Sequence, residues 1–585
     1  MNGLSREWID SIPIDPVFST SRLRWQESIM SYIDKEDFAS SNLAVSAAVP
    51  GANREQNEAS PIDDAFDSDD TPILQDKMPE WFRTSWVFPA SVALLGVFFL
   101  YLSYQPLWHT DLWGHLSYGR VLAEDGLDSL YGEEPLMPLA VGVDFIDTAW
   151  LSQYVTYIAY KNLGISVLQF IYALSITSCL AMLMTRFYRH SGSFLVSLLG
   201  LAAFLWVDWQ QLLIIRPQLA GLAGFIATFG LLTARRWKPV YWVLMPGLIA
   251  LWANLHGSFI MGLALMASFA IGHAFDVFRR TRNWKAVVSS RQVQRLILVT
   301  QLAAVAALIN PYGLALYTEV LTFGSNPNLN DLIEWDALNL RMSQGQAAAA
   351  IGFALIVLYR LSPRRVRAIE VILLAGLGAA TLWHSRMILW WAPIAAYYFV
   401  RHGAAVWRRF RNKATHKEPR SVASLWTVTG LAMIWLCFAP TNFALRVLHG
   451  KEPSLQSQRR MLSPNTPIDA TAHLHQMAAA DRLPKGVIFN PYYWGDYLLW
   501  AGPQQLDVFV ASHVQYIPRT VWGHYRSVSL MRDSFEQTLD RYGINLMVVD
   551  KMYSGRLIDH MKRDPKWLVE FESPLAVIFT RAEPI

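Results

Sequence analysis

The chain has 585 residues, of which 53% are hydrophobic and only 16% are charged. Soluble domains carry about 25% charged residues, so this composition is typical of a membrane protein. Two cysteines in the whole sequence exclude a disulfide scaffold and a cysteine-rich metal module. The net charge of +4 does not indicate nucleic-acid binding, because the positive residues gather in short loops between apolar runs.

The first 82 residues differ from the rest of the chain. They hold 16 acidic and 6 basic side chains, and residues 38–79 are rich in Ser, Ala and Asp but poor in large apolar residues. Such a segment cannot bury enough apolar surface to fold. We therefore expect residues 1–82 to form a largely disordered acidic tail.

Apolar runs recur from residue 83 to residue 440. A transmembrane helix needs ~20 mostly apolar residues, and eleven runs, with one more or fewer plausible, are candidates. They are Trp86–Tyr104, Gly164–Thr185, Ser193–Trp209, Pro217–Ala234, Val240–Leu255, Phe259–Phe278, Leu296–Ile309, Gln346–Leu361, Ile369–Trp383, Met387–Val400 and Ser424–Pro440. The fold class is therefore predicted to be mainly α, a polytopic helical membrane protein, with an outer loop at 105–149.

The basic residues alternate between the loops. Every second loop is basic, and these loops carry 22 Lys and Arg, whereas the alternate loops carry five. Lys and Arg accumulate on the cytoplasmic side of a membrane. The N-terminal tail is therefore predicted to be cytoplasmic, and an odd number of spans places the C-terminus outside.

Residues 441–585 change character. Runs at Val487–Asn490, Val508–Val510, Leu546–Asp550 and Ala576–Thr580 predict short strands, and Ser534–Tyr542 and Arg556–Arg563 predict helices. This length is sufficient for one domain. We expect an extracytoplasmic α/β domain here.

The outer loop contains the first candidate site. Asp111 and His115 are four residues apart, so on a helix they share a face. A carboxylate walled by Trp108 and Trp113 would have its pKa raised by desolvation and could act as a general base toward a hydroxyl. The alternative is an interfacial loop of solvated acids and headgroup-level aromatic residues.

Polar residues also recur at the predicted outer ends of later spans. Arg216 and Arg386 could bind a phosphate, and His256 and His384 could carry protons or ligate a metal. Asn254 and Glu334 complete the set of candidate substrate-binding residues with the two histidines. Each alone could simply cap a helix end, but the alternation of the loops places all of them at one face.

Several known motifs are missing from the sequence. It has no GxxxxGK[ST], HExxH or GxSxG pattern, which argues against a nucleotide-driven pump and a cytosolic nucleotide-sugar enzyme. The acids and histidine of the first loop permit a divalent metal, but no ligand spacing is diagnostic, so the cofactor stays open.

An ordered set of short motifs resembles the bacterial multi-pass glycosyltransferases of GT-C fold, which depend on lipid-linked sugars. The motifs are Asp111–Leu116, Gly119-Arg120, Trp150–Gln153, Arg216–Gln218, Trp252–Ser258, Asn310–Gly313, Glu334-Trp335, Trp494–Leu498, Trp522 and Tyr542–Ile544. The likeness covers roughly residues 84–580.

The resemblance implies a reaction and a site. Asp111 matches the acidic residue that serves these enzymes as base, or as part of a metal site, for an acceptor hydroxyl, with His115 beside it. The donor resembles a polyprenyl-phosphate sugar, and Arg216 and Arg386 are the candidates for holding its phosphate. The expected partners are the lipid bilayer, the lipid-linked sugar and a glycan, lipid or protein acceptor, at the bacterial cytoplasmic (inner) membrane.

The chain departs from this family in two places. Thr110, not a second acid, precedes Asp111, which leaves a two-carboxylate or metal-bound site open. Relatives often have an Asp-Gly-Arg-like turn where this chain has residues 511–513, Ala-Ser-His. Two other functions also stay open: a transporter or flippase, for which broken polar spans are suitable, and a non-catalytic membrane scaffold.

Overall fold

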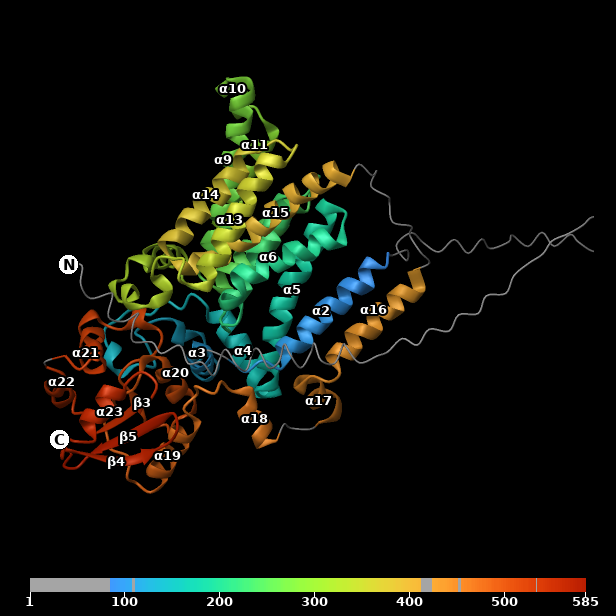
Figure 1. Ribbon diagram of the computed structural model, residues 1–585. Helices are drawn as coiled ribbons and strands as arrows, with labels where there is room; N and C mark the ends of the chain where they lie inside the picture. Colours follow the sequence, from blue (N-terminus) through green and yellow to red (C-terminus); the bar gives the residue numbers. More distant parts are fainter. Residues whose placement is uncertain (1–84, 108–110, 412–422, 451–453, 533, 585) are drawn as a thin grey trace, which may run out of the picture. The chain divides into compact units, whose positions relative to one another are not determined.

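The computed structural model describes residues 85–107, 111–411, 423–450, 454–532 and 534–584, which all belong to one compact unit, Lys77–Ile585 (Figure 1). The predicted tail, Trp108 and Thr110 lie outside the described residues.

Each apolar run that the sequence indicates coincides with a helix. These helices are α2 (Val87–Ser103), α5 (Ser166–Ser191), α6 (Phe194–Leu212), α7 (Gln218–Leu232), α8 (Tyr241–Leu255), α9 (Phe259–Thr281), α11 (Arg291–Ala306), α13 (Ser343–Leu361), α14 (Ala368–Trp383), α15 (Ile388–Arg411) and α16 (Ala423–Phe438). The chain is thus mainly helical. The helices could be predicted from the apolar runs because buried or lipid-facing helices are apolar on all sides.

The number of membrane spans is a separate question from the number of helices. Among the described residues, α5, α6, α9 and α13 are long and apolar enough to cross a membrane, and α16 with α17 (Asn442–His449) makes a fifth if this pair, bent by 94°, is one span. Helices α2, α7, α8 and α14 are apolar but shorter. The protein is a multi-pass membrane protein by these features, and a count of about eleven spans stays a prediction.

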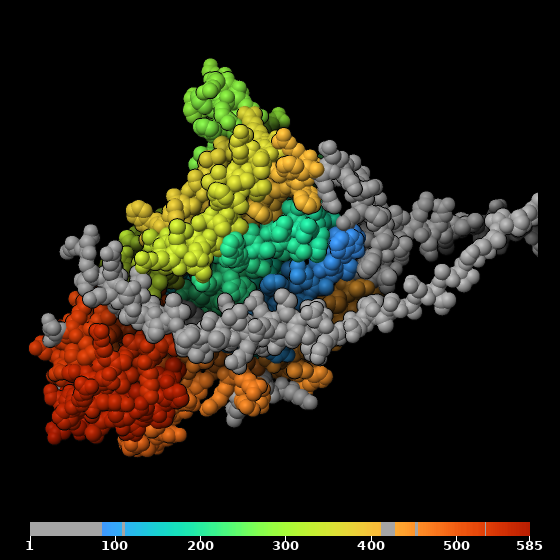
Figure 2. All heavy atoms as spheres, in the orientation of Figure 1, coloured from blue at the N-terminus to red at the C-terminus, as the bar shows by residue number. Residues whose placement is uncertain are grey.

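The helices carry large apolar side chains on their outer surfaces. On α13, Phe353 and Ile356 are each 69% exposed, and on α14 Val371 is 55% exposed. Both helices are yellow in the space-filling view of Figure 2. Water tolerates such contiguous apolar surface poorly, whereas lipid tails accept it.

The loop predicted at 105–149 contains a helix of its own. It is α3 (Asp111–Asp125), followed by the short 3₁₀ turns η2 (Leu127–Leu130) and η3 (Pro138–Ala140), and then by α4 (Trp150–Leu163). Two further 3₁₀ turns, η6 (Ile333–Trp335) and η7 (Ser385–Met387), carry candidate site residues. The remaining connections include α10 (Trp284–Val288), α12 (Leu314–Thr322), η4 (Phe323–Ser325) and η5 (Pro327–Asp331).

Trp252 fixes how α7, α8 and α9 pack. Its side chain is 1% exposed, and glycines from the two neighbouring helices line its ring. A Cβ at Gly224 of α7 would lie 2.8 Å from the ring, and one at Gly262 of α9 would lie 2.6 Å away. Trp252 Nε1 donates to Ser258 Oγ at 3.1 Å, so this packing also positions the turn that carries His256.

The C-terminal region mixes strands and helices. It contains α18 (Leu455–Met461), α19 (Ile468–Ala479), β1 (Val487–Ile488), α20 (Tyr492–Ala501), β2 (Asp507–Val508), η8 (Val514–Tyr516), α21 (Arg519–Ser529), α22 (Phe535–Arg541), β3 (Leu546–Asp550), α23 (Gly555–Met561), β4 (Trp567–Glu572) and β5 (Ala576–Arg581). Strands β3, β5 and β4 form an antiparallel sheet in that order, and β1 pairs with β2 in parallel. A bridge from Phe489 to Met547 links the two pairings.

The C-terminal elements share a hydrophobic core with the first outer connection. Tyr118 of α3, Met137 and Phe145 belong to the same buried cluster as Phe509 and Trp522. The sequence predicted a separate domain at 441–585. The shared core means that α3 and its loop are packed against residues almost 400 positions later in the chain.

Overpacking at Gly224 should destabilise the protein. Ala there places a methyl group against the Trp252 ring, and such overpacking costs about 1–3 kcal/mol, so we expect Gly224→Ala to lower the unfolding temperature of the purified protein. Gly230→Ala on the same helix is the control, because nothing lies within 4 Å of a Cβ at that position. Equal unfolding temperatures for both variants would contradict the packing described here.

Candidate functional site

Four charged side chains form one chain of ion pairs. Arg216, between α6 and α7, contacts two carboxylates: its Nε lies 2.6 Å from Asp111 Oδ2, and its Nη1 lies 2.8 Å from Glu334 Oε2. The other oxygen of Glu334 lies 3.2 Å from Arg386 Nη1. The four side chains are 12–25% exposed. Charge therefore alternates along a mostly buried cluster, in which each ion is compensated by a neighbour.

The turns η6 and η7 hold Glu334 and Arg386 against each other. Ser385 Oγ donates to the carbonyl oxygen of Glu334 at 3.0 Å. His384 Nδ1 lies 2.7 Å from the carbonyl oxygen of Trp335, and because a carbonyl only accepts, Nδ1 carries the proton. The Arg386 guanidinium lies 4.8 Å from the centroid of the Trp335 ring. The sequence analysis predicts that His384 binds substrate. In the structure, its Nδ1 donates to the backbone of η6, the turn that carries Glu334.

His256 and Asn254 lie at the end of α8. His256 Nδ1 accepts from the backbone N–H of Ser258 at 3.0 Å and lies 2.7 Å from its Oγ. Asn254 Nδ2 donates to the carbonyl oxygen of Ile309 at 2.7 Å, and Trp150 Nε1 donates to Asn254 Oδ1 at 3.1 Å. Asn254 thus ties α8 to α4 and to the turn after α11.

Burial and charge together determine the protonation of His256 and Glu334. Burial, with the charges of Arg386 and Arg216, lowers the pKa of His256 to about 3, so this imidazole is neutral. Burial alone would raise the pKa of Glu334, but Arg216 and Arg386 outweigh burial and hold it at about 2. Glu334 is therefore an ionised carboxylate at any physiological pH.

His115 connects α3 to α4. Gln153 Nε2 donates to His115 Nδ1 at 3.1 Å and to Asp147 Oδ1 at 3.0 Å, and the backbone N–H of Ala149 donates to the same Asp147 oxygen at 2.9 Å. Burial and the neighbouring His513 lower the pKa of His115 well below its usual range. Because Nδ1 accepts, the neutral ring carries its proton on Nε2.

His513, from the C-terminal region, faces His115. The two ring centroids are 5.0 Å apart with the rings at 89°. Asp496 Oδ1 lies 3.6 Å from His513 Nδ1, its side chain is 1% exposed, and its Oδ2 accepts from the backbone N–H of Ser512. Burial would lower the pKa of His513, but contact with Asp496 outweighs burial and raises it. Gly114 permits this approach, because a Cβ there would meet the Asp496 carboxylate and His513.

The surroundings of Asp111 differ from the sequence-based expectation. Trp113 does not wall the carboxylate but packs edge-on against Tyr497, with ring centroids 5.4 Å apart. The reason is helical geometry, since residues two positions apart on a helix do not share a face. The Arg216 guanidinium stands beside Asp111 instead.

The structure therefore brings most of the predicted residues together. Asp111, Arg216, Glu334 and Arg386 meet directly, and His115 and His256 lie within electrostatic reach of Arg216. Asn254 and His384 instead form hydrogen bonds to backbone carbonyl groups, those of Ile309 and Trp335.

Sequence reasoning missed the site contributions of Asp147, Asp496 and His513. Each stands in a segment that the sequence singled out: the acidic loop, the Trp494–Leu498 motif and the altered turn at 511–513. One signal was available: His513 stands in the turn at 511–513, where relatives often have an Asp-Gly-Arg-like sequence, and Asp496 lies in a nearby motif. No local sequence pattern, however, places His513 or Asp496 beside α3.

A divalent metal shared by Asp111 and Glu334 does not fit this arrangement. The Arg216 guanidinium contacts both carboxylates and occupies the place where a shared cation would bind.

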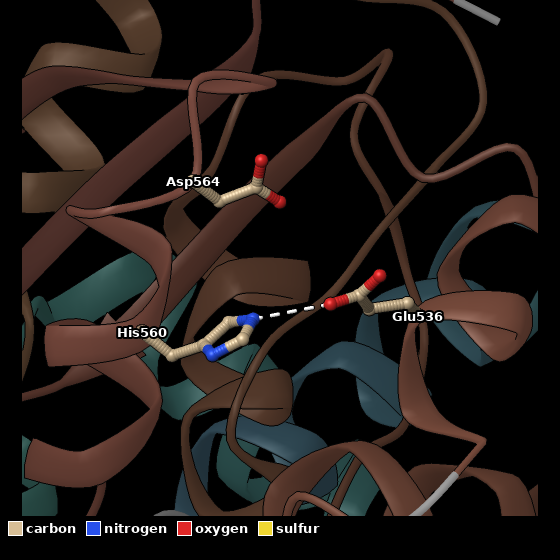
Figure 3. Close-up of side chains that lie close together, drawn as sticks. All are labelled: Glu536, His560 and Asp564. Atoms are coloured by element: carbon tan, nitrogen blue, oxygen red, sulfur yellow. Dashed lines mark hydrogen bonds and ion pairs between the residues drawn. The ribbon is translucent and has the colours of Figure 1, made fainter.

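Another group of ligand types comes together in the C-terminal region. Within the described ranges, Glu536, His560 and Asp564 place one potential ligand atom each within 4.8 Å of one another (Figure 3). His560 Nε2 lies 3.1 Å from Glu536 Oε1, and the two side chains are 38% and 50% exposed. The group is therefore partly exposed at the surface, where acidic side chains commonly gather without a metal ion.

Comparison with known proteins supports the fold. No family model and no curated protein matches the sequence. Among solved structures, the chain is similar to the apo oligosaccharyltransferase of Archaeoglobus fulgidus, with 12% identity, a TM-score of 0.50, and coverage of 81% of this chain and 71% of that chain. The same enzyme tethered with an acceptor peptide containing the NVT sequon gives 12% identity, a TM-score of 0.50, and coverage of 86% and 75%.

A third structure is weaker. The arabinofuranosyltransferase AftD from Mycobacteria is 14% identical over 85% of this chain and 42% of that chain, with a TM-score of 0.48, too low to carry an argument. These structural neighbours are glycosyltransferases of GT-C fold. At such identities the likeness establishes the fold alone.

Asp147 should make stability depend on pH. Burial raises the pKa of the folded carboxyl to about 7, whereas an unfolded Asp titrates near ~3.9. Below about pH 4 both states are protonated. As the pH rises toward 7 the unfolded chain releases its proton first, which favours unfolding. Between about pH 5 and pH 8 the wild type should lose roughly 2.5 kcal/mol of stability through this carboxyl, and Asp147→Asn should not show this loss, as measured by thermal unfolding.

Asp144→Asn, at an exposed carboxylate of the same loop, is the control and should follow the wild type. An unchanged pH dependence in Asp147→Asn would contradict the buried, proton-binding carboxyl.

Proposed function

We propose that this protein is an inverting glycosyltransferase that moves a sugar from a polyprenyl-phosphate-type donor to an acceptor hydroxyl at the outer face of the bacterial cytoplasmic membrane. The observation that carries the proposal is the convergence of Asp111, Arg216, Glu334 and Arg386 into one cluster. The GT-C fold supports the general class of reaction. The donor, the acceptor and the face of the membrane are part of the proposal.

The chemistry divides between the carboxylate and the arginines. Asp111 accepts the proton of the acceptor hydroxyl as the oxygen attacks the anomeric carbon. The bond from that carbon to the lipid phosphate breaks, and the phosphate leaves with the electron pair. Arg386 stabilises this developing negative charge, because guanidinium pairs well with phosphate.

The two arginines differ in how far carboxylates already occupy their guanidinium groups, and this decides which is better able to bind the donor phosphate. Arg216 already forms ion pairs with two carboxylates, whereas Arg386, within the described part of the chain, forms one with Glu334 alone. Arg386 is therefore the better candidate for the donor phosphate. Arg216 orients Asp111, and Glu334 holds the two arginines in place.

Transport is the principal alternative, and the distribution of buried acids favours transfer. A transporter places polar groups near the middle of its spans. Here the buried carboxyls of the apolar helices are Asp208, near the C-terminal end of α6, and Glu370, in the first turn of α14. The charged cluster lies in connections between helices, where a transferase needs it.

Asp111→Asn should abolish sugar transfer, because the amide cannot accept the proton, while the protein still inserts and folds. Asp125→Asn, at the exposed other end of α3, is the matched control and should keep full activity. The assay is mass spectrometry of lipid-linked sugars and cell-envelope glycans in cells that carry each variant. Normal glycans with Asp111→Asn would remove Asp111 as the base.

Arg386→Ala should weaken binding of the lipid donor more than binding of the acceptor. Loss of a charge-assisted phosphate contact is expected to raise the KM for the donor about tenfold or more, with a smaller change for the acceptor. Arg341→Ala removes an exposed arginine from a loop of the same predicted face and should change neither value. Equal loss for both substrates would exclude the phosphate assignment.

A further inference from the structure

A polar cavity lies away from the Asp111 cluster, among the loops whose basic residues predict the cytoplasmic side. It has a volume of about 760 Å³ and is lined from α9, α14 and α15, the loop between α13 and α14, and the ends of α5 and α7. This volume is in the range of small-ligand sites.

The lining is strongly positive. It includes seven arginines but only two carboxylates, Asp276 and Glu370. Within the part of the chain that the structure describes, none of these seven arginines forms an ion pair with a carboxylate. Arg364 and Arg365 come from the α13–α14 loop, and Arg408 comes from α15.

The two carboxylates are already engaged. Glu370, 1% exposed, contacts His402 Nε2 at 2.9 Å through Oε2, which also accepts from Tyr359 Oη at 3.1 Å. Asp276 Oδ1 accepts from the backbone N–H of Ala368 and lies 3.5 Å from Arg279 Nη2. Neither acid forms an ion pair with a lining arginine within the described residues, although the charge of Glu370 acts on Arg364 and Arg401.

Three of the seven arginines, Arg364, Arg401 and Arg408, are half-buried, and the other four are exposed at the mouth of the cavity. Burial and the charges of Arg401 and Arg408 lower the pKa of Arg364. Arg401 Nε is buried and has no hydrogen-bond partner among the described residues. The positive-inside rule explains why arginines occur on this side, but it does not explain why several helices place them around one cavity with a buried donor unsatisfied.

We propose that this cavity binds the phosphate group of an anionic ligand. Phosphate accepts bidentate hydrogen bonds from guanidinium groups, and an anion there would relieve the mutual repulsion of the arginines. Two sources carry this chemistry: the headgroup of an anionic phospholipid, for which basic pockets between helices on the cytoplasmic side are suitable, and a soluble phosphate compound. Apolar lining residues such as Phe269 and Ile369 accommodate the less polar part of a ligand.

The experiment uses the full chain purified in detergent and three probes: phosphatidylglycerol, phosphatidylcholine and inorganic pyrophosphate. Thermal unfolding and native mass spectrometry measure binding. The test variant is Arg364→Gln with Arg408→Gln, both in the lining. The control is Arg360→Gln with Arg409→Gln, exposed arginines close by in the sequence that do not line the cavity and whose loss removes the same charge.

We expect an anionic probe to raise the unfolding temperature of the wild type and of the control, and the lining variant to bind it at least about tenfold more weakly. A response to phosphatidylglycerol alone identifies a lipid headgroup, and a response to pyrophosphate identifies a soluble phosphate. If neither probe binds, if phosphatidylcholine acts as well as phosphatidylglycerol, or if both variants lose binding equally, the proposal is wrong. Should the double variant fail to fold, Arg364→Gln alone gives the same comparison with Arg360→Gln.

Discussion

Arg216 is the residue on which the site depends. Its guanidinium contacts Asp111 from α3 and Glu334 from η6, two segments more than 200 residues apart in the chain. In a largely buried position, loss of this guanidinium would remove an ion-pair partner from Asp111 and leave Glu334 with Arg386 alone. Breaking a buried ion pair costs several kcal/mol (~3–5). The turn η6 and the start of α3 are therefore held together by a single side chain.

Other contacts in the fold position the residues around this chain of ion pairs. The Trp252 packing fixes the turn at His256, and the stacking of Arg386 on Trp335 fixes η7 against η6. The C-terminal region adds His513 through its contact with Asp496. A site made from connections rather than from helix interiors is well placed to receive a substrate whose lipid part stays in the bilayer.

The helices were predictable because long apolar runs have few alternatives, and β3 was predictable because it is buried and β-branched. Strand β4 was missed because it lies at a sheet edge, has only one buried residue, and has an irregularity between Val569 and Phe571. Helix α20 was missed because Gly and aromatic residues are weak helix formers. The contact between His513 and His115 could not be predicted from the sequence. Hydrophobic periodicity indicates local secondary structure but does not show which distant segments pack together.

The central claim is that Asp111 and Arg216 interact directly, and a double-mutant cycle tests it most directly. Unfolding free energies are measured for Asp111→Asn, Arg216→Gln and the double variant. The ion pair predicts a coupling energy of about 1–3 kcal/mol between the two changes. Additive effects, with a coupling energy near zero, would contradict the account.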